Sequence, residues 1–491
     1  MTELPLAFAG AEDGAEEGAR DPAGPFASAA RIAQAVRAGE VSAREVAEAA
    51  LARIAAVDPA INAYTDVTAD RALAEAAAVD AARAAGRPLG PLAGVPYGVK
   101  NLFDVAGLVT RAGSRINRDR PPAVADATLV RRMEAAGAVL LGGLNMGEYA
   151  YDFTGENLHD GNCLNPHDPG RMSGGSSSGC GAATAAGLAP VSLGSDTNGS
   201  LRVPASLCGV FSLKPTYGRL GRGGAFPFVD SLDHLGPLAR TAEDLALAYD
   251  ALQGPDPADH ACAGRPVEPA APSLGAGAAG LRVGVLDGWF AAKAGPEAVR
   301  ALDRAVAGLA ACGAEARPAR LDEAEAGRAA AFLITNAEGA AFHRDRLRSR
   351  AAEFDPDTRD RFLAGALLPA GWVVRAQRVR RWWLERALAA FREVDLLLVP
   401  ATPVPAPPSG AKVLEIGGRS APLRPSLGLL AQPFSCIGLP VVTAPVFAPG
   451  EPPIGVQIVA PPWREDLALR AAAALAAAGV ACAHPPSRLE A

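Results

Sequence analysis

The sequence predicts an α/β layered fold. Two observations support this prediction. Stretches with the apolar spacing of amphipathic helices alternate along the chain with short apolar runs typical of buried strands. The chain of 491 residues is 49% hydrophobic, which is ample for a large buried core. No fixed-period repeat is visible.

Helix signals dominate the N-terminal part. Residues 1–25 are rich in Gly, Ala and Glu with little periodicity, so we expect a flexible leader there. Ser42 and Glu45 form a capping box at the start of an amphipathic helix. Farther along we expect helices over 69–85 and 128–136, a turn and strand over 90–99, and a strand over 138–141.

The rest of the chain alternates more regularly. Residues 170–235 are dense in Gly and Ser and contain a predicted helix over 182–188. The Pro- and Ala-rich stretch 255–279 is interpreted as a surface excursion. We then expect a strand over 281–286, helices to about 395, strands over 396–399 and 455–459, and a closing helix over 466–478.

Composition excludes several classes of protein. The net charge of −6 gives no basic footprint for nucleic acid. Seven scattered Cys residues without a CxxC pair argue for free thiols in a reducing compartment, and we expect no metal site or cofactor. The apolar run 182–191 is too short to span a membrane, and no signal peptide is visible. We therefore expect a cytoplasmic protein.

Two Gly-Ser motifs carry the chemistry. The segment 173–179 (SGGSSSG) lacks the closing Lys-Ser/Thr pair of a phosphate loop, and 194–204 (GSDTNGSLRVP) follows soon after. Glycines beside a Ser let backbone N–H groups approach a reacting carbonyl. A nucleophilic Ser also needs a base. His234 is the one tempting His, but a structural role is favoured; Lys100 is favoured over Lys214, because an apolar strand delivers it into the interior.

At this point the motifs resemble the amidase-signature family. The match covers about residues 28–480 and includes the blocks 94–100, 145–156, 173–205, 208–219 and 453–459. The resemblance implies a catalytic domain over 26–485, with a mixed central β-sheet covered by α-helices on both faces. It also implies amide C–N hydrolysis.

The resemblance assigns roles by position. Lys100 matches the catalytic Lys, Ser176 the bridging Ser that follows a cis peptide bond, and Ser200 the nucleophile. The oxyanion hole matches the backbone N–H groups of Thr197, Asn198, Gly199 and Ser200. Supporting positions match Ser177, Asp196 and Arg202, and we expect the last two to pair.

Substrate contacts are less determined. Asn198 stands where the family usually has a small residue, and a backbone role and a substrate contact are equally favoured. Arg111 is either a solvated side chain or, because a guanidinium pairs well with carboxylate, an anion-binding one. Tyr149 is a further candidate. Cys163, Cys180 and Cys208 are interpreted as small packing residues, and Trp382-Trp383 as core packing on a helix whose Arg-rich face could dock an acidic partner.

Several segments resemble the branch that contains the large subunit of carboxybiuret hydrolase, among them 147–156, 226–236 and 462–466. This resemblance implies a small, anionic ureido-type substrate such as 1-carboxybiuret or an oxalurate-like compound, with ammonia release. It also implies a homodimer, and a further partner in the form of a small accessory helical subunit. A general aliphatic or aryl amidase and the glutaminase subunit of a tRNA-dependent amidotransferase remain alternatives.

Overall fold

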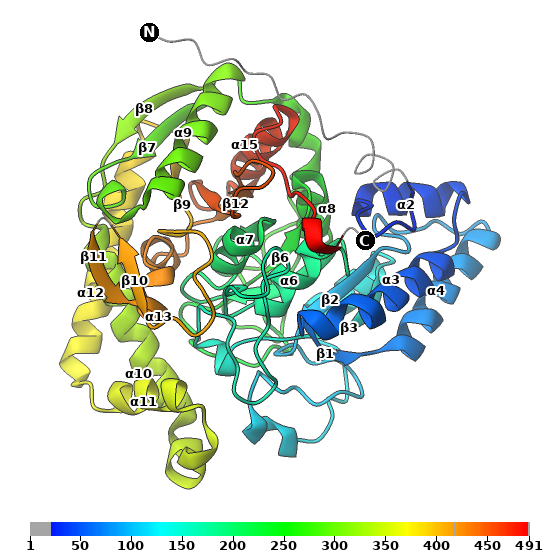
Figure 1. The fold of residues 1–491 in the computed structure, drawn as a ribbon, viewed down its shortest axis with the longest axis horizontal. Helices are drawn as coiled ribbons and strands as arrows, with labels where there is room; N and C mark the ends of the chain where they lie inside the picture. The colour runs from blue at the N-terminus through cyan, green and yellow to red at the C-terminus, as the bar shows by residue number, and fades with distance from the viewer. Residues whose placement is uncertain (1–20, 417, 490–491) are drawn as a thin grey trace.

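The computed structural model describes residues 21–416 and 418–489. One mixed sheet of eleven strands crosses the molecule, in the order β1-β3-β2-β4-β6-β5-β12-β13-β9-β7-β8 (Figure 1). Its strands are β1 (Tyr64–Val67), β2 (Pro96–Lys100), β3 (Val139–Leu144), β4 (Val191–Asp196), β5 (Phe211–Lys214), β6 (His234–Ala239), β7 (Arg282–Leu286), β8 (Glu315–Ala319), β9 (Leu396–Pro400), β12 (Val441–Pro445) and β13 (Gly455–Val459). Strands β10 (Val413–Ile416) and β11 (Arg419–Pro422) form a separate hairpin.

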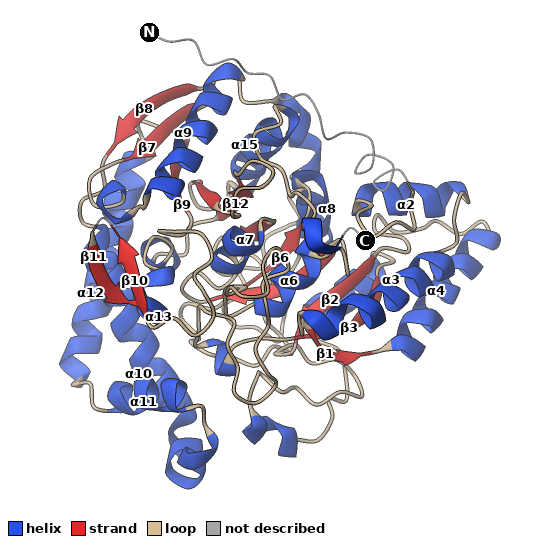
Figure 2. Ribbon diagram, in the orientation of Figure 1, coloured by secondary structure: helices blue, strands red, loops and turns tan. Residues whose placement is uncertain are grey.

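Helices surround this sheet (Figure 2). They are α2 (Ala29–Ala38), α3 (Ala43–Val57), α4 (Ala69–Ala84), α5 (Thr128–Ala135), α6 (Ser178–Ala185), α7 (Arg202–Cys208), α8 (Ala242–Leu252), α9 (Pro296–Ala311), α10 (Ala324–Arg350), α11 (Pro356–Ala366), α12 (Ala370–Ala390), α13 (Leu423–Leu427), α14 (Gln432–Cys436) and α15 (Glu465–Ala477). Helices α10, α11 and α12 pack together as a lobe on the side opposite α2–α4 (Figure 1). The predicted α/β fold with a mixed central sheet is confirmed.

Strand direction sets up the site. Strand β2 runs parallel to both of its neighbours, β3 and β4, with Val99 opposite Leu193. The carboxyl ends of parallel strands lie at one edge of a sheet, where the loops that follow can meet. Lys100 ends β2 and Asp196 ends β4, so these two residues emerge at the same edge.

Local sequence signals correctly predicted the N-terminal helices. Helix α3 begins after the predicted capping box, in which Ser42 Oγ accepts from the Glu45 N–H at 3.0 Å and a Glu45 carboxylate oxygen accepts from the Ser42 N–H at 2.8 Å. The expected strands near 99, 141, 281–286, 396–399 and 455–459 are present as β2, β3, β7, β9 and β13.

Three expectations need correction or fall outside the description. Helix α6 begins at Ser178 rather than at residue 182, and it ends before Gly187, whose φ of 68° is left-handed. The predicted helical run to about 395 is interrupted by β8, an exposed edge strand that pairs only with β7 and therefore lacks an apolar signature. Of the predicted leader, residues 1–20 lie outside the described residues, and 21–25 form turns.

Candidate active site

Lys100 occupies the centre of the candidate site. Its side chain is fully buried, and its Nζ donates to Ser176 Oγ at 2.7 Å and to Ser195 Oγ at 2.9 Å. Burial lowers the pKa of Lys100 to about 7, although the charges of Asp233 and Asp196 act in the opposite direction. A lysine with this pKa is half neutral at pH 7, so it can accept a proton from a hydroxyl group.

The first Gly-Ser segment wraps around this amine. The peptide bond between Gly175 and Ser176 is cis. The N–H of Ser177 donates to the carbonyl of Ser200 at 3.3 Å, which places the two Gly-Ser motifs side by side. The Ser177 hydroxyl also donates to the Ser195 carbonyl at 3.0 Å. Ser177 therefore joins the first motif to both β4 and the loop that carries Ser200.

A buried ion pair holds the second motif. Arg202 Nε lies 3.0 Å from Asp196 Oδ2, and both side chains are fully buried, so the expected pair forms. Burial alone would raise the pKa of Asp196, but the charge and hydrogen bonds of Arg202 outweigh it and lower this pKa. The carboxylate also accepts the N–H groups of Gly199 at 2.7 Å and Leu201 at 3.2 Å. It thus closes the loop around Ser200.

These bonds change one expectation for the oxyanion hole. The N–H of Gly199 is bound to Asp196 and does not face a substrate. Within the described residues, the N–H groups of Thr197, Asn198 and Ser200 donate to no protein atom. Thr197, Asn198 and Ser200 also line the main cavity, so their N–H groups remain the candidate oxyanion donors.

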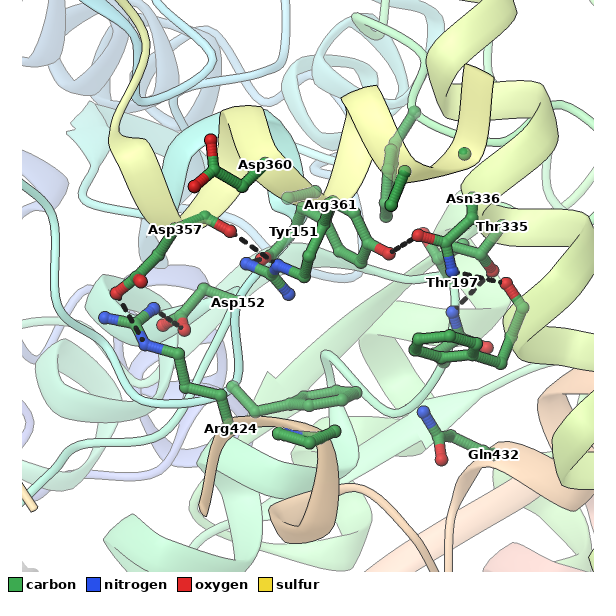
Figure 3. Close-up of a pocket in the computed structure, with 18 of the residues that line it drawn as sticks. Tyr151, Asp152, Thr197, Thr335, Asn336, Asp357, Asp360, Arg361, Arg424 and Gln432 are labelled. Atoms are coloured by element: carbon green, nitrogen blue, oxygen red, sulfur yellow. Dashed lines mark hydrogen bonds and ion pairs between the residues drawn. The ribbon is translucent and has the colours of Figure 1, made fainter. Parts of the chain in front are cut away.

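The main cavity has a volume of about 610 Å³ and lies over Ser200 (Figure 3). Thr197 and Asn198 form one wall, with Thr197 Oγ1 bound to Asp233 at 2.6 Å and Asn198 Nδ2 bound to Thr335 Oγ1 at 2.7 Å. Helix α10, which carries Thr335, continues this wall, and Asp357, Asp360 and Arg361 of α11 line another part of the cavity. Asn198 thus faces the cavity with its side chain as well as its backbone.

Arg361 of α11 projects into this cavity (Figure 3). Its guanidinium lies 3.9 Å from the ring centroid of Tyr151 and donates to the carbonyls of Tyr151 and Asp357. Within the described residues, no carboxylate forms an ion pair with it. By contrast, the neighbouring Arg424 binds Asp152 at 2.6 Å. Arg361 thus brings a positive charge to the cavity, near the carboxylates of Asp152 and Asp357.

The structure does not bring two predicted substrate contacts to the cavity. Arg111 instead pairs with Asp66 at 2.9 Å and with Asp160 at 3.2 Å, so its charge is neutralised elsewhere. Tyr149 is buried in an aromatic cluster, with its ring centroid 4.1 Å from that of His343. The neighbouring Tyr151 lines the cavity in its place.

The alternative bases are also accounted for. Lys214 is buried and donates to the carbonyl of Pro215 at 3.0 Å, and within the described residues it forms no hydrogen bond to either Gly-Ser motif. His234 Nδ1 lies 2.6 Å from the carbonyl of Leu232, in keeping with a structural role. Burial raises the pKa of Cys163 and Cys180 to about 12, so neither thiol is reactive. Among residues 21–416 and 418–489, no cluster of His, Cys, Asp or Glu could hold a metal ion.

Sequence reasoning missed several residues of the site. Ser195, which contacts Lys100, lies inside the second Gly-Ser motif, and Asp233 lies in the segment 226–236 that marks the branch resemblance. Arg361, Thr335 and Gln432 line the cavity from α11, α10 and α14, where no local signal marks them.

Comparison with known proteins decides the family. A family model described as "Amidase" matches residues 45–469. The chain belongs to the amidase family. It is 56% identical to AtzE, a 1-carboxybiuret hydrolase subunit of Pseudomonas sp. (strain ADP), over 92% of this chain and 98% of that relative.

Other amidases are more distant. A glutamyl-tRNA(Gln) amidotransferase subunit from Roseiflexus sp. (strain RS-1) is 37% identical over 89% of this chain and 93% of its own length. A solved structure described as an unexpected vestigial protein complex that reveals the evolutionary origins of an s-triazine catabolic enzyme matches with a TM-score of 0.91. It is 54% identical and covers 93% of this chain and 100% of its own. The chain is thus a carboxybiuret hydrolase-like amidase.

Proposed function

We propose that this amidase hydrolyses a small anionic ureido compound, such as 1-carboxybiuret or oxalurate, through an acyl-enzyme on Ser200. The observation that carries the proposal is the combination of a buried, partly neutral Lys100 on Ser176 with an unpaired cation, Arg361, in the cavity that contains Ser200. The similarity to a 1-carboxybiuret hydrolase subunit supports the same substrate class.

The proposed chemistry needs no other group. Ser200 Oγ bonds to the amide carbon while its proton passes through Ser176 to neutral Lys100. The N–H groups of Thr197, Asn198 and Ser200 are the donors for the oxyanion, and one such donor contributes about 3 kcal/mol. The C–N bond then breaks, and the proton held by Lys100 leaves with the nitrogen as ammonia. Water attacks the acyl-enzyme, and the acid product and free Ser200 result.

Arg361 selects the charge of the substrate in this proposal. A guanidinium binds a carboxylate with two parallel hydrogen bonds, and in a partly buried site such a pair is strong. The 1-carboxybiuret molecule carries its carboxylate at the end remote from the terminal amide. Arg361 would therefore hold the carboxylate while the amide reaches Ser200.

The test is ammonia release from 1-carboxybiuret, oxalurate, biuret, acetamide, benzamide and glutamine, with Ser200→Ala in parallel. We expect release from the ureido acids, none from Ser200→Ala, and a loss of about 10²-fold in kcat/KM for Arg361→Met on 1-carboxybiuret. The exposed Arg375 provides the matched control, because Arg375→Met should leave these rates unchanged. Turnover of simple amides alone, or of glutamine alone, would refute the substrate class.

We also propose that residues 26–485 form one catalytic domain and that the protein is a cytoplasmic homodimer with a small accessory helical chain. The accessory chain is supported by the solved complex and by the relative's designation as one subunit of its enzyme. All seven Cys residues are free thiols, in keeping with a reducing compartment. No helix within residues 21–416 and 418–489 combines the length and apolar character needed to cross a membrane. A monomer in light scattering, with no co-purifying small protein, would refute the assembly.

A further inference from the structure

The orientation of the Gln432 side-chain amide is fixed by a hydrogen bond from Arg328. Gln432 is the first residue of α14, it lines the main cavity, and it is only 3% exposed. Arg328 Nε donates to Gln432 Oε1 at 2.8 Å. A guanidinium carries only hydrogen-bond donors, so the amide must present its oxygen to Arg328. Its nitrogen, Nε2, therefore faces the other way.

That other side is the cavity. In Figure 3 the amide nitrogen of Gln432 points into the open space between this residue and Arg361, and no dashed line reaches it. Nε2 has no hydrogen-bond partner among residues 21–416 and 418–489. Nε2 is not one of the fully buried side-chain atoms that lack a partner, so solvent in the cavity reaches it, and a carbonyl oxygen of a ligand can replace that solvent. The side chain is thus a rigid donor aimed into the site.

The same segment is held in register with the nucleophile loop. Arg202, the partner of Asp196, donates to the carbonyl of Ala431 at 2.9 Å, one residue before Gln432. Arg328 Nη2 also donates to the carbonyl of Pro425 at 2.9 Å, which secures the chain ahead of α14. The Gln432 donor therefore keeps a fixed position relative to Ser200.

We propose that Gln432 is a specificity-determining residue whose Nε2 donates to a second carbonyl oxygen of the substrate, beyond the carbonyl that Ser200 attacks. The proposal rests on the proposed function and deepens it: the preferred substrate is an acyl urea with two carbonyls, not a simple amide or a simple urea. Arg361 recognises charge, whereas Gln432 recognises the neutral oxygen of the chain.

The test measures binding rather than turnover. Biuret and N-ethylurea are both neutral, and N-ethylurea has an ethyl group in place of the second carbonyl of biuret and the amino group attached to it. Their dissociation constants are measured by calorimetry on the Ser200→Ala variant of the full chain, together with any accessory chain that co-purifies. We expect biuret to bind at least about tenfold more tightly than N-ethylurea, and Gln432→Leu to remove this preference by weakening biuret alone.

Two further variants sharpen the result. Gln432→Glu keeps the contact with Arg328 but presents an acceptor to the cavity, so it should lose the preference as Gln432→Leu does. Gln377→Leu, on the outer helix α12, should leave both constants unchanged. Equal binding of the two ligands, a preference that survives in Gln432→Leu, or a parallel loss for both ligands would overturn the proposal. Absent binding of biuret would overturn it too, whereas failed ammonia release with intact binding would count only against the proposed reaction.

Discussion

Changing the pH should titrate the base of the proposed reaction. Lys100 accepts a proton only when it is neutral, and burial lowers its pKa to about 7. Activity should therefore rise with pH, reach half of its maximum near pH 7, and level off above pH 8. Only the acid limb of the profile is assigned to Lys100.

The size of the effect follows from the two pKa values. A lysine with the ordinary pKa of 10.5 is neutral in only about one molecule in 3,000 at pH 7, whereas a pKa of about 7 makes half of the molecules competent. Burial thus provides roughly a 10³-fold larger population of neutral base. Lys100→Arg, which stays protonated, should reduce kcat/KM by at least that factor.

The assay is kcat/KM for ammonia release between pH 5 and 10. Asp233 is buried, and its negative charge raises the pKa of Lys100, so Asp233→Asn should move the acid limb to lower pH. Asp230→Asn is the matched control, because the Asp230 side chain is 58% exposed and its charge is screened by solvent. A half-maximum near pH 10, or a limb that Asp233→Asn leaves in place, would refute the reasoning.

Other predictions concern stability. Asp196→Asn leaves Arg202 buried without a carboxylate and should cost about 3–5 kcal/mol in guanidinium unfolding; a loss below about 1 kcal/mol would contradict the bracing role. Trp383→Ala should lower the free energy of unfolding by about 3–5 kcal/mol, because Trp383 is fully buried and its Nε1 donates to the carbonyl of Pro433. The control is Trp382→Ala, which should cost less than about 1.5 kcal/mol because Trp382 is partly exposed. Lys100→Met should raise Tm relative to the parent most below pH 7, where the parent must bury a charge, and this gain should vanish as pH approaches 10.5; a constant difference would contradict it.

The sequence was most informative where structure is local. The run that ends at Lys100 is apolar because β2 is buried in the middle of the sheet, and this pattern alone favoured Lys100 over Lys214 as the base. The two Gly-Ser motifs follow each other closely, so their proximity in space could be expected. Ser177 indeed bonds to the backbone of Ser200.

Residues distant in sequence could not be placed in this way. Arg361 belongs to α11 of the lobe and Gln432 to the short helix α14, and only the packing of these separate segments around Ser200 places both at the cavity. The contacts of Arg111 could not be predicted for the same reason. Its partners, Asp66 and Asp160, come from separate segments of the chain, and no pattern near Arg111 in the sequence predicts these ion pairs.

Arg202 also has a consequence for biosynthesis. Its hydrogen bonds reach Ala431, Ser435 and Gln457, which are made long after the nucleophile itself. Until those residues leave the ribosome, the guanidinium has only the Asp196 carboxylate among these acceptors. We therefore expect a nascent chain to contain Ser200 well before the loop around it has its full set of hydrogen bonds.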